Sequence, residues 1–358
     1  MRGVTHPWEI TIQSKNGLLC LGRKISPRVS GAVGGGHKFE ICTGIFSKMY
    51  VEEFLEACPL PILPHTLHLG DVLGEGNVEV RQAMMNGNEY AVKVFNYSED
   101  YDSMDDFYNE IMDEVTILNL VKGSSQSVTS RGVCYDDSGD VKVYVVMEKL
   151  SGDMNKYIQE GKFWTPSRTY NNVLTPKPVS DYVCFNEDDG FHWCYHMPRP
   201  KKIKILQSFV SAVAELHKLH IVHADIKSKN IMFHYSGKEQ FVKLIDMGAA
   251  THMGNHTEMD IPIIIGTTGY AAPEQGSGYI TYKSDTYSLG VSLIEIWNGD
   301  IWENGDSFRE CRNEVLYGLR KIEKENNAFG KLLRRCINLQ ESKRPSIECL
   351  SKKVEELF

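Results

Sequence analysis

The sequence contains no long apolar run. No stretch approaches the roughly 18 consecutive apolar residues that a membrane-spanning helix requires, and the opening MRGVTHPWEITIQ lacks the apolar core of a secretory signal. The nine cysteines are an odd number without a repeated spacing, which favours reduced thiols over the disulfide framework of a secreted domain. We therefore expect a cytoplasmic or nuclear protein without a membrane span, acting inside a host cell if a pathogen produces it.

An excess of positive charge is missing as well. The chain has 39 Lys and Arg against 47 Asp and Glu, a formal net charge of −8, so we expect no nucleic acid among its partners. No internal repeat occurs, which argues against a solenoid. The length of 358 residues and the hydrophobic content of 42% predict a globular protein with a large core and more than one domain.

The N-terminal stretch has the pattern of a separate extension. WEITIQ and LLCLG alternate apolar and polar residues around Asn16-Gly17, which predicts a β-hairpin with a tight turn. Ser47–Ala57 predicts a short amphipathic helix that ends before the proline-rich CPLPILPH. We place a boundary near Pro64, so that residues 1–65 form an N-terminal extension with a hairpin and a helix.

The rest of the chain divides into a β-rich part and a helix-rich part. Residues 66–148 contain short β-like segments such as EYAVKVF, interrupted by one helical stretch at about 104–121. Helical periodicity dominates the C-terminal part, beginning with ILQSFVSAVAELHKLH. This order predicts an α+β protein of two lobes, with an N-lobe over about 66–148 and a C-lobe over about 150–358.

Residues 161–202 interrupt this pattern and predict an insertion. They are rich in aromatic residues and prolines and have no clean period. Four potential zinc ligands lie in this stretch: Cys184, His192, Cys194 and His196. Their spacing fits no familiar zinc module, so ordinary packing is favoured over zinc binding. The insertion and the N-terminal extension are both candidate sites for a regulatory partner.

Two glycines and a lysine in the β-rich part predict contacts with phosphate. Gly74 and Gly76 in LGEG follow a strand-like run and lack the Cβ atoms that would hold a turn away from phosphate oxygens. Two glycines alone more often mark an ordinary turn. Lys93 lies in an otherwise apolar strand and, if buried, needs a charged partner. Glu110 and Glu114 share one face of the following helix and could supply it.

The segment IVHADIKSKNIMF carries the strongest chemical signal. It places Asp225, Lys227 and Asn230 on a loop between apolar runs. Asp225 can accept a proton from an attacking hydroxyl, Lys227 can neutralise a transferring phosphoryl group, and Asn230 can bind Mg²⁺. In VKLIDMGAA, Asp246 ends an apolar strand, where a carboxylate can be the main Mg²⁺ ligand. These residues predict phosphoryl transfer from ATP.

Six motifs in one order resemble the eukaryotic-type (Hanks-type) protein kinases. LGEG, AVKV, HADIKSKN, IDMG, YAAPE and KSDTYSLG occur in the order of that family, over about residues 66–356. The resemblance implies a protein kinase domain over 66–358, ATP and Mg²⁺ as cofactors, and a protein substrate. It also implies that Lys93 binds the α- and β-phosphates with Glu114 as its ion-pair partner, since Glu114 directly precedes an apolar stretch.

The same resemblance implies further roles. Met147 would gate the adenine pocket, Glu148 to Leu150 would form the hinge whose backbone binds adenine, and Asp153 would reach the ribose. Three residues would be structural: Glu274, Arg344 as its partner, and Asp285 as the anchor of the catalytic loop. Lys227 and Thr267 match the serine/threonine kinases, so we expect transfer to serine or threonine hydroxyls.

Three positions depart from the family pattern. Glu79 occupies the position of the third glycine of the Gly-rich loop, where a carboxylate would oppose ATP unless it points outward. Ala224 replaces an arginine that reads a phosphate on the activation segment, which suggests activity without strict dependence on that phosphate. Met247 replaces a phenylalanine and can fill the same apolar space.

Two other classes of protein stay open as alternatives. A pseudokinase would keep the fold as a binding or allosteric scaffold, and the departures at Glu79 and Ala224 are its only support. A small-molecule kinase on a related fold would share the HxDxxxxN-like loop. Such enzymes usually lack the APE and SDTYSLG segments, both of which are present here.

Overall fold

The computed structural model describes the backbone of most of the chain. The described residues are 11–14, 17–20, 51–64, 66–74, 78–98, 101, 103–136, 141–153, 166–170, 173–176, 182–187, 190–195, 199–236, 239–261, 265–298 and 308–358. Only the backbone is described for 153, 235–236, 239–241 and the strands within 11–20 and 166–195. Gly76 and residues 262–264 lie outside this set.

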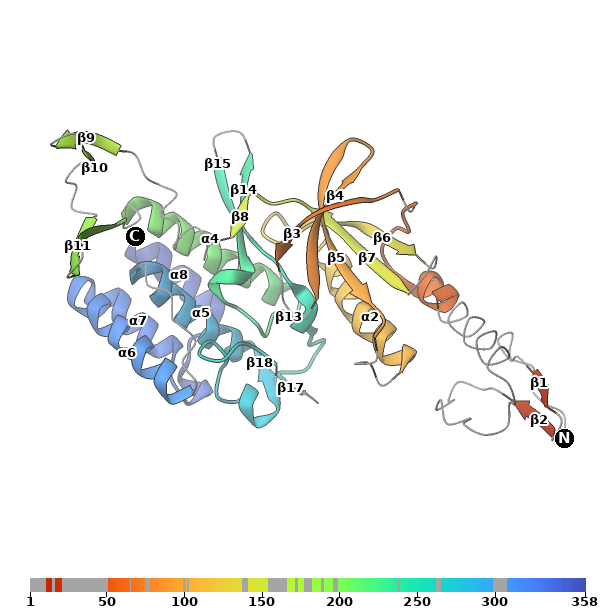
Figure 1. Ribbon diagram of the computed structural model, residues 1–358. Helices are drawn as coiled ribbons and strands as arrows, with labels where there is room; N and C mark the ends of the chain where they lie inside the picture. The colour runs from red at the N-terminus through yellow and green to blue at the C-terminus, as the bar shows by residue number, and fades with distance from the viewer. Residues whose placement is uncertain are drawn as a thin grey trace.

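The N-lobe is an antiparallel sheet of five strands with one long helix against it (Figure 1). The strand order is β3-β4-β5-β7-β6. The strands are β3 His68–Gly74, β4 Glu79–Met85, β5 Asn88–Asn96, β6 Ser130–Asp136 and β7 Lys142–Glu148. Because β5 pairs with both β4 and β7, its backbone is hydrogen-bonded along both edges, and this fixes the direction of its side chains.

Helix α2 (Met104–Leu120) owes its start and its orientation to local sequence. Ser103 is its N-cap, and the Ser103 Oγ accepts a hydrogen bond from Asp106 N at 3.1 Å. The negative charges of Asp105 and Asp106 in the first turn also stabilise the helix, because they lie next to the positive end of its dipole. Its apolar face is buried toward the sheet, including Phe107 and Ile111. This packing sets where Glu114 can point.

The C-lobe is helical and is built around α5 (Tyr282–Asn298), which is buried along almost its whole length. The other helices are α4 Arg199–Lys218, α6 Phe308–Glu325, α7 Asn327–Cys336 and α8 Ile347–Leu357, with 3-10 turns η3 Gln275–Ser277 and η4 Glu341–Lys343. A β-rich lobe followed by a helical lobe confirms the predicted α+β class.

Short strands and turns that accompany the helices of the C-lobe carry the loops of interest. Antiparallel pairs are formed by β13 Ile221–Val222 with β16 Thr251–His252, β14 Ile231–Ser236 with β15 Glu239–Leu244 and β8 Gly152–Asp153, and β17 Glu258–Asp260 with β18 Tyr279–Thr281. Turn η1 (Ser228–Asn230) follows β13 and precedes β14, and η2 (Met247–Ala249) follows β15. Asn230 lies in η1, Asp225 and Lys227 lie within three residues before it, and Asp246 directly precedes η2.

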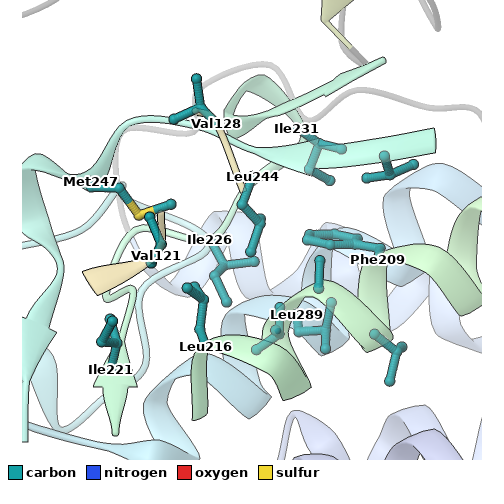
Figure 2. Packing of buried hydrophobic residues seen from close by; sticks show 14 of the residues in the cluster. Val121, Val128, Phe209, Leu216, Ile221, Ile226, Ile231, Leu244, Met247 and Leu289 are labelled. Carbon is teal, nitrogen blue, oxygen red and sulfur yellow. The ribbon is translucent and has the colours of Figure 1, made fainter. Parts of the chain in front are cut away.

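A continuous apolar core supports these loops from below (Figure 2). Leu216 from α4, Leu289 from α5 and Ile226 from the loop after β13 are all fully buried in it. Met247 lies in the same cluster with 1% of its surface exposed, as expected for an apolar filler at that position. The loop is therefore held by packing as well as by hydrogen bonds.

The segment before the sheet packs on the N-lobe. Residues 51–57 are helical, and the Phe54 ring lies 5.2 Å from the ring of Tyr108 on α2. Ile62 bridges Val133 of β6 in parallel, and a Cβ on Gly132 would come within 2.3 Å of the Pro61 carbonyl oxygen. The predicted boundary near residue 64 therefore divides residues that share one core.

Two predicted segments differ in detail from the structure. Strands β1 (Thr11–Ser14) and β2 (Gly17–Cys20) pair antiparallel with Ser14 opposite Gly17, so Gly17 lies in the strand and not in the turn. In the insertion, β9 Pro166–Tyr170 pairs with β10 Val173–Pro176, and β11 Tyr182–Glu187 with β12 Gly190–Tyr195. Residues 199–202, predicted as insertion, begin α4. The side chains of the zinc-ligand candidates lie outside the described residues.

Candidate active site

Lys93 is the centre of a charged cluster between the two lobes. Its Nζ lies 2.7 Å from Glu114 Oε2 on α2 and 3.0 Å from Asp246 Oδ1 before η2. The pleat of β5 explains this direction, because Val92 and Val94 pack in a separate cluster on the opposite face of the sheet. Glu110 is exposed, so Glu114 is the carboxylate that contacts the lysine.

The charges of this cluster stabilise one another. Burial would lower the pKa of Lys93, but the carboxylates of Glu114 and Asp246 outweigh it and raise that pKa well above its usual value. Burial would raise the pKa of Asp246, and the Lys93 ammonium holds it below its usual range. At neutral pH the lysine is therefore a cation and Asp246 an anion. Burial raises the pKa of Glu114, opposed by Lys93.

The loop after β13 holds Asp225 in a triangle of hydrogen bonds. Lys227 Nζ donates to Asp225 Oδ2 at 2.6 Å and to Thr267 Oγ1 at 2.6 Å. Thr267 Oγ1 in turn donates to Asp225 Oδ1 at 2.7 Å. Asn230 Nδ2 donates to the Asp225 carbonyl at 2.9 Å and to Oδ2 at 3.1 Å. Both carboxylate oxygens are therefore held in a fixed direction.

Asp285 on α5 fixes the backbone of this loop. Its two carboxylate oxygens accept hydrogen bonds from the backbone N–H groups of His223 at 2.8 Å and Ala224 at 2.9 Å. His217 Nε2 lies 2.9 Å from the same carboxylate, which is fully buried. Ala224 has a φ of 63°, a left-handed conformation that is unusual for a residue with a Cβ. The anchor expected at Asp285 is thus present.

Asp246 combines a strained backbone with an accessible carboxylate. Its φ of 59° is left-handed, and 44% of its side-chain surface is exposed. Gly248 follows in η2, where a Cβ would lie 3.3 Å from Lys93 Nζ. A larger residue at position 248 would press on the lysine. Glycine therefore keeps this part of the site open.

The predicted nucleotide pocket is described in part. Met147 and Leu150 are buried on either side of Glu148, whose carboxylate accepts hydrogen bonds from Thr129 N and from Lys243 Nζ at 2.8 and 2.5 Å. Burial would raise the pKa of Glu148, but these donors lower it. Gly74 ends β3; Gly76 and the Asp153 side chain lie outside the described residues.

Glu79 pairs with Val94 in the sheet, so its side chain lies on the face opposite Lys93. Arg81 Nη1 lies 3.3 Å from Glu79 Oε1 within β4. The same guanidinium donates to the Gly70 carbonyl oxygen at 2.8 and 3.0 Å. The negative charge that the sequence suggested would oppose ATP is therefore partly balanced by a neighbouring cation.

Two residues at the site carried no prediction from the sequence. Lys243 of β15 contacts Glu148, which the resemblance places in the hinge, and Gln275 donates to the carbonyl oxygen of Ala224, next to Asp225. Lys243 is a charged residue in the apolar VKLID, and Gln275 directly follows APE. A polar residue inside an apolar run was the available signal for Lys243. Nothing local distinguishes Gln275 from an exposed glutamine.

A second ion pair lies below the site. Arg344 Nη1 and Nη2 donate to the two oxygens of Glu274 at 2.5 and 2.8 Å, and both side chains are almost fully buried. The pairing expected between these residues is present. Burial would raise the pKa of Glu274, but the guanidinium lowers it.

Comparison with known proteins defines the family of this chain. The model of the protein kinase domain matches residues 67–354. The chain therefore belongs to the protein kinase family, as the motifs predicted.

The relatives are longer proteins. The chain is 28% identical over 238 residues to serine/threonine-protein kinase PrkC of Bacillus subtilis, covering 65% of this chain and 30% of the relative. It is 27% identical over 310 residues to wall-associated receptor kinase-like 3 of Arabidopsis thaliana, covering 80% of this chain and 37% of that protein. A third relative, calcium-dependent protein kinase 4 of Plasmodium falciparum, is 25% identical over 251 residues, covering 69% and 40%. The chain thus spans well under half of each of these relatives.

Within the described residues, none of the helices combines the length and apolar composition needed to cross a bilayer.

Proposed function

We propose that this chain is an active protein kinase that transfers the γ-phosphate of ATP to serine or threonine hydroxyls of a protein substrate. The observation that carries this proposal is the hydrogen-bonded triangle of Asp225, Lys227 and Thr267. It joins a base, a cation and a hydroxyl at one point. The name of one relative, serine/threonine-protein kinase PrkC of Bacillus subtilis, supports the same hydroxyl preference.

Asp225 acts as the base in this proposal. Its carboxylate is held by Lys227 and Thr267, so it can be aimed at the hydroxyl of a bound substrate and accept its proton. Lys227 neutralises charge on the phosphoryl group during transfer. Because positioning supplies most of the acceleration in this reaction, the fixed orientation of Asp225 is what the loop contributes.

Lys93, held by Glu114, binds the α- and β-phosphates of ATP. The raised pKa of Lys93 keeps it cationic at any physiological pH, which suits a permanent phosphate ligand. The backbone of Gly74 and Gly76 would cover the phosphates. Three buried or half-buried residues would form the adenine side of the pocket, namely Met147, Glu148 and Leu150, and Asp153 would bind the ribose.

Asp246 and Asn230 would hold Mg²⁺. Among the described residues, no group of three or more His, Cys, Asp or Glu side chains could hold a metal, so the protein offers only a small oxygen set here. That set fits Mg²⁺, which usually takes one or two carboxylates together with water and phosphate oxygens. Asn230 turns its Nδ2 to Asp225, which leaves its Oδ1 as the ligand atom. When bound, Mg²⁺ neutralises charge on the β- and γ-phosphates.

The wider organisation is part of the same proposal. Residues 66–358 form the kinase domain, with an N-lobe over about 66–148, a C-lobe over about 150–358 and an insertion at about 161–202. A regulatory partner would bind through residues 1–65 or through the insertion. The protein would act in the cytoplasm or nucleus, of a host cell if a pathogen produces it.

A pseudokinase is the second candidate, and the departures at positions 79 and 224 are what favour it. The pairing of Glu79 with Arg81 weakens the first of these arguments. The second concerns regulation, because Ala224 removes no group that the transfer itself needs. The four groups that the reaction requires are all present: Lys93, Asp225, Asn230 and Asp246.

The test is phosphate transfer by the purified protein with radiolabelled ATP and Mg²⁺, with and without a generic basic protein substrate. An Asp225→Ala variant run in parallel removes the base. We expect label on the wild type, none on the variant, and phosphoserine or phosphothreonine on mapping. Equal absence of label on both proteins, with ATP still raising the melting temperature, would favour the pseudokinase. Label on phosphotyrosine alone would contradict the hydroxyl preference.

A further inference from the structure

Gln275 is a fully buried amide at the start of η3, and its side chain makes three hydrogen bonds to backbone. Its Nε2 donates to the carbonyl oxygens of Ala224 at 2.7 Å and Ile265 at 3.2 Å. Its Oε1 accepts from the backbone N–H of Ala272 at 2.8 Å. No part of the side chain is exposed to solvent.

These contacts join the two segments that form the Asp225 triangle. Ala224 directly precedes Asp225, and Ile265 lies two residues before Thr267, which donates to the Asp225 carboxylate. The amide therefore ties the backbone of the Asp225 loop to the backbone that presents Thr267. The tie adds a link through the backbone to the side-chain hydrogen bonds among Asp225, Lys227 and Thr267.

The backbone around the amide is shaped to fit it. Gly266 has a φ of 99°, and a Cβ at this position would lie 2.8 Å from Gln275 Nε2 and 3.1 Å from the Ala224 carbonyl oxygen. Ala224 itself has a φ of 63°, which turns its carbonyl toward the amide. The two residues with positive φ, Ala224 and Gly266, are therefore at or directly beside the carbonyl groups that the Gln275 amide binds.

The chemistry of the tie is neutral and complete within the chain. An amide NH₂ has two N–H donors, one for each of the two carbonyl oxygens, and its carbonyl oxygen matches the Ala272 N–H. The Ala224 side chain packs in a small apolar cluster with Val222 and Met253. These contacts join neutral groups only. They therefore form without a phosphate group on the chain and without an arginine or lysine to bind that phosphate.

We propose that Gln275 is a positioning residue: a neutral tie that holds the backbone just before Thr267 against the Asp225 loop without phosphorylation. This inference rests on the proposed kinase activity. It goes beyond that proposal by naming the group that sets the geometry of Asp225 and Thr267.

The main test is Gln275→Glu, which keeps the shape but places an acceptor against two carbonyl oxygens. We expect kcat to fall about 10- to 100-fold, because buried carbonyl groups lose their donors, while the KM for ATP stays within about twofold. Gln275→Met removes both donors without adding charge and should lower kcat similarly. Gln340→Glu, at an exposed site, is the matched control and should keep wild-type kcat.

A pH profile separates positioning from a loss of folding. The carboxyl group introduced by Gln275→Glu regains one donor when it is protonated, so the kcat of this variant relative to wild type should rise as the pH falls from about 8 toward 6. The same ratio for Gln275→Met should stay flat. A melting curve for each variant establishes that the protein is folded at the assay temperature. Folded variants with wild-type kcat at every pH would overturn the proposal.

A third measurement uses the wild type alone and remains decisive if neither variant folds. Phosphatase treatment followed by mass spectrometry gives a protein without phosphate on residues 251–267. We expect its initial rate to match that of the untreated protein within about twofold, since the tie is made within the chain. A rate that falls at least tenfold and returns on rephosphorylation would overturn the proposal. If the wild type itself transfers no phosphate, the proposed function fails first.

Discussion

Two buried ion pairs in this molecule use the same kinds of residue for different ends. Arg344 and Glu274 lie below the site and bind each other through both oxygens. Lys93 and Glu114 lie between the lobes and share the lysine with Asp246. Both pairs hold charges that would be costly to bury alone.

The pairs differ in how far their bonding capacity is used. The Arg344 guanidinium is fully buried and also donates to the carbonyl oxygens of Lys283 and Asn338, while Ser284 Oγ donates to Glu274. In the other cluster, Asp246 has an accessible carboxylate. A saturated pair can only stabilise the fold, whereas an open one can still bind a ligand. The difference lies in exposure and not in residue type.

The largest expected effect comes from breaking the saturated pair. Arg344→Ala leaves the Glu274 carboxylate buried without its cation, so we expect the free energy of unfolding to fall by about 3–5 kcal/mol. Urea denaturation measures it. Arg344→Lys keeps the charge but loses the two parallel hydrogen bonds, so its free energy of unfolding should lie between those of the wild type and Arg344→Ala. A loss below about 1 kcal/mol for the alanine variant would mean that the pair is not a structural anchor.

The open pair depends on where α2 lies, and the segment before the sheet supports that helix. Phe54→Ala removes a buried ring from Tyr108, so we expect a loss of about 3–4 kcal/mol in unfolding free energy. Phe54→Leu should recover part of it. Thermal denaturation measures both. Wild-type stability in Phe54→Ala would show that residues 51–57 do not contribute to the N-lobe core.

A third buried carboxylate, that of Glu295, accepts a hydrogen bond from a tyrosine hydroxyl and has no buried cation as its partner in that bond, unlike Glu274 and Glu114. Burial raises the pKa of Glu295 to about 7, and Tyr270 Oη donates to it at 2.8 Å. The pKa in the folded state is thus above the ordinary 4.5, so the stabilising effect of protonation is complete below pH 4.5 and is lost as the pH rises through 7.

Glu295→Gln should remove this dependence. Of the change in unfolding free energy between pH 8 and pH 5, Glu295 should account for about 2.5 kcal/mol, and the neutral amide should abolish that part. Urea denaturation at a series of pH values measures it, with Glu310→Gln at the first turn of α6 as a control. Superimposable pH curves for wild type and Glu295→Gln would contradict the raised pKa.

The smallest effect separates two glutamates on one helix. Glu114→Gln keeps a hydrogen-bond acceptor for Lys93 but removes the charge, so we expect kcat/KM to fall about 10- to 100-fold. Glu110→Gln changes an exposed residue on the same helix and should stay within about twofold. Equal losses for both variants would mean that the general charge of α2, and not the contact with Lys93, matters.

Much of the fold and of the site could be predicted from local sequence. Apolar period marked the β-rich and helical parts, and six short motifs placed Lys93, Asp225, Asn230 and Asp246 in family order. The choice of Glu114 over Glu110 came from the resemblance, and the structure has Glu114 against the lysine. The α+β class and the contact between Lys93 and Glu114 agree with the structure, because each depends on a few neighbouring residues whose types the chemistry restricts.

The contacts of Gln275, Lys243 and Phe54 could not be predicted in this way. Gln275 acts on a backbone carbonyl 51 residues earlier in the chain, and Lys243 on a carboxylate 95 residues earlier. Every residue has a backbone carbonyl group, so residue type does not indicate which one a distant side chain binds. In the same way, the identity of a buried phenylalanine does not indicate which helix it packs against. The sequence by itself determined which chemical groups are available and in what order. Only the tertiary structure decided which ion pair is saturated, which keeps an accessible carboxylate and how residues 51–57 pack against α2, because burial and hydrogen-bond geometry arise when distant segments pack together.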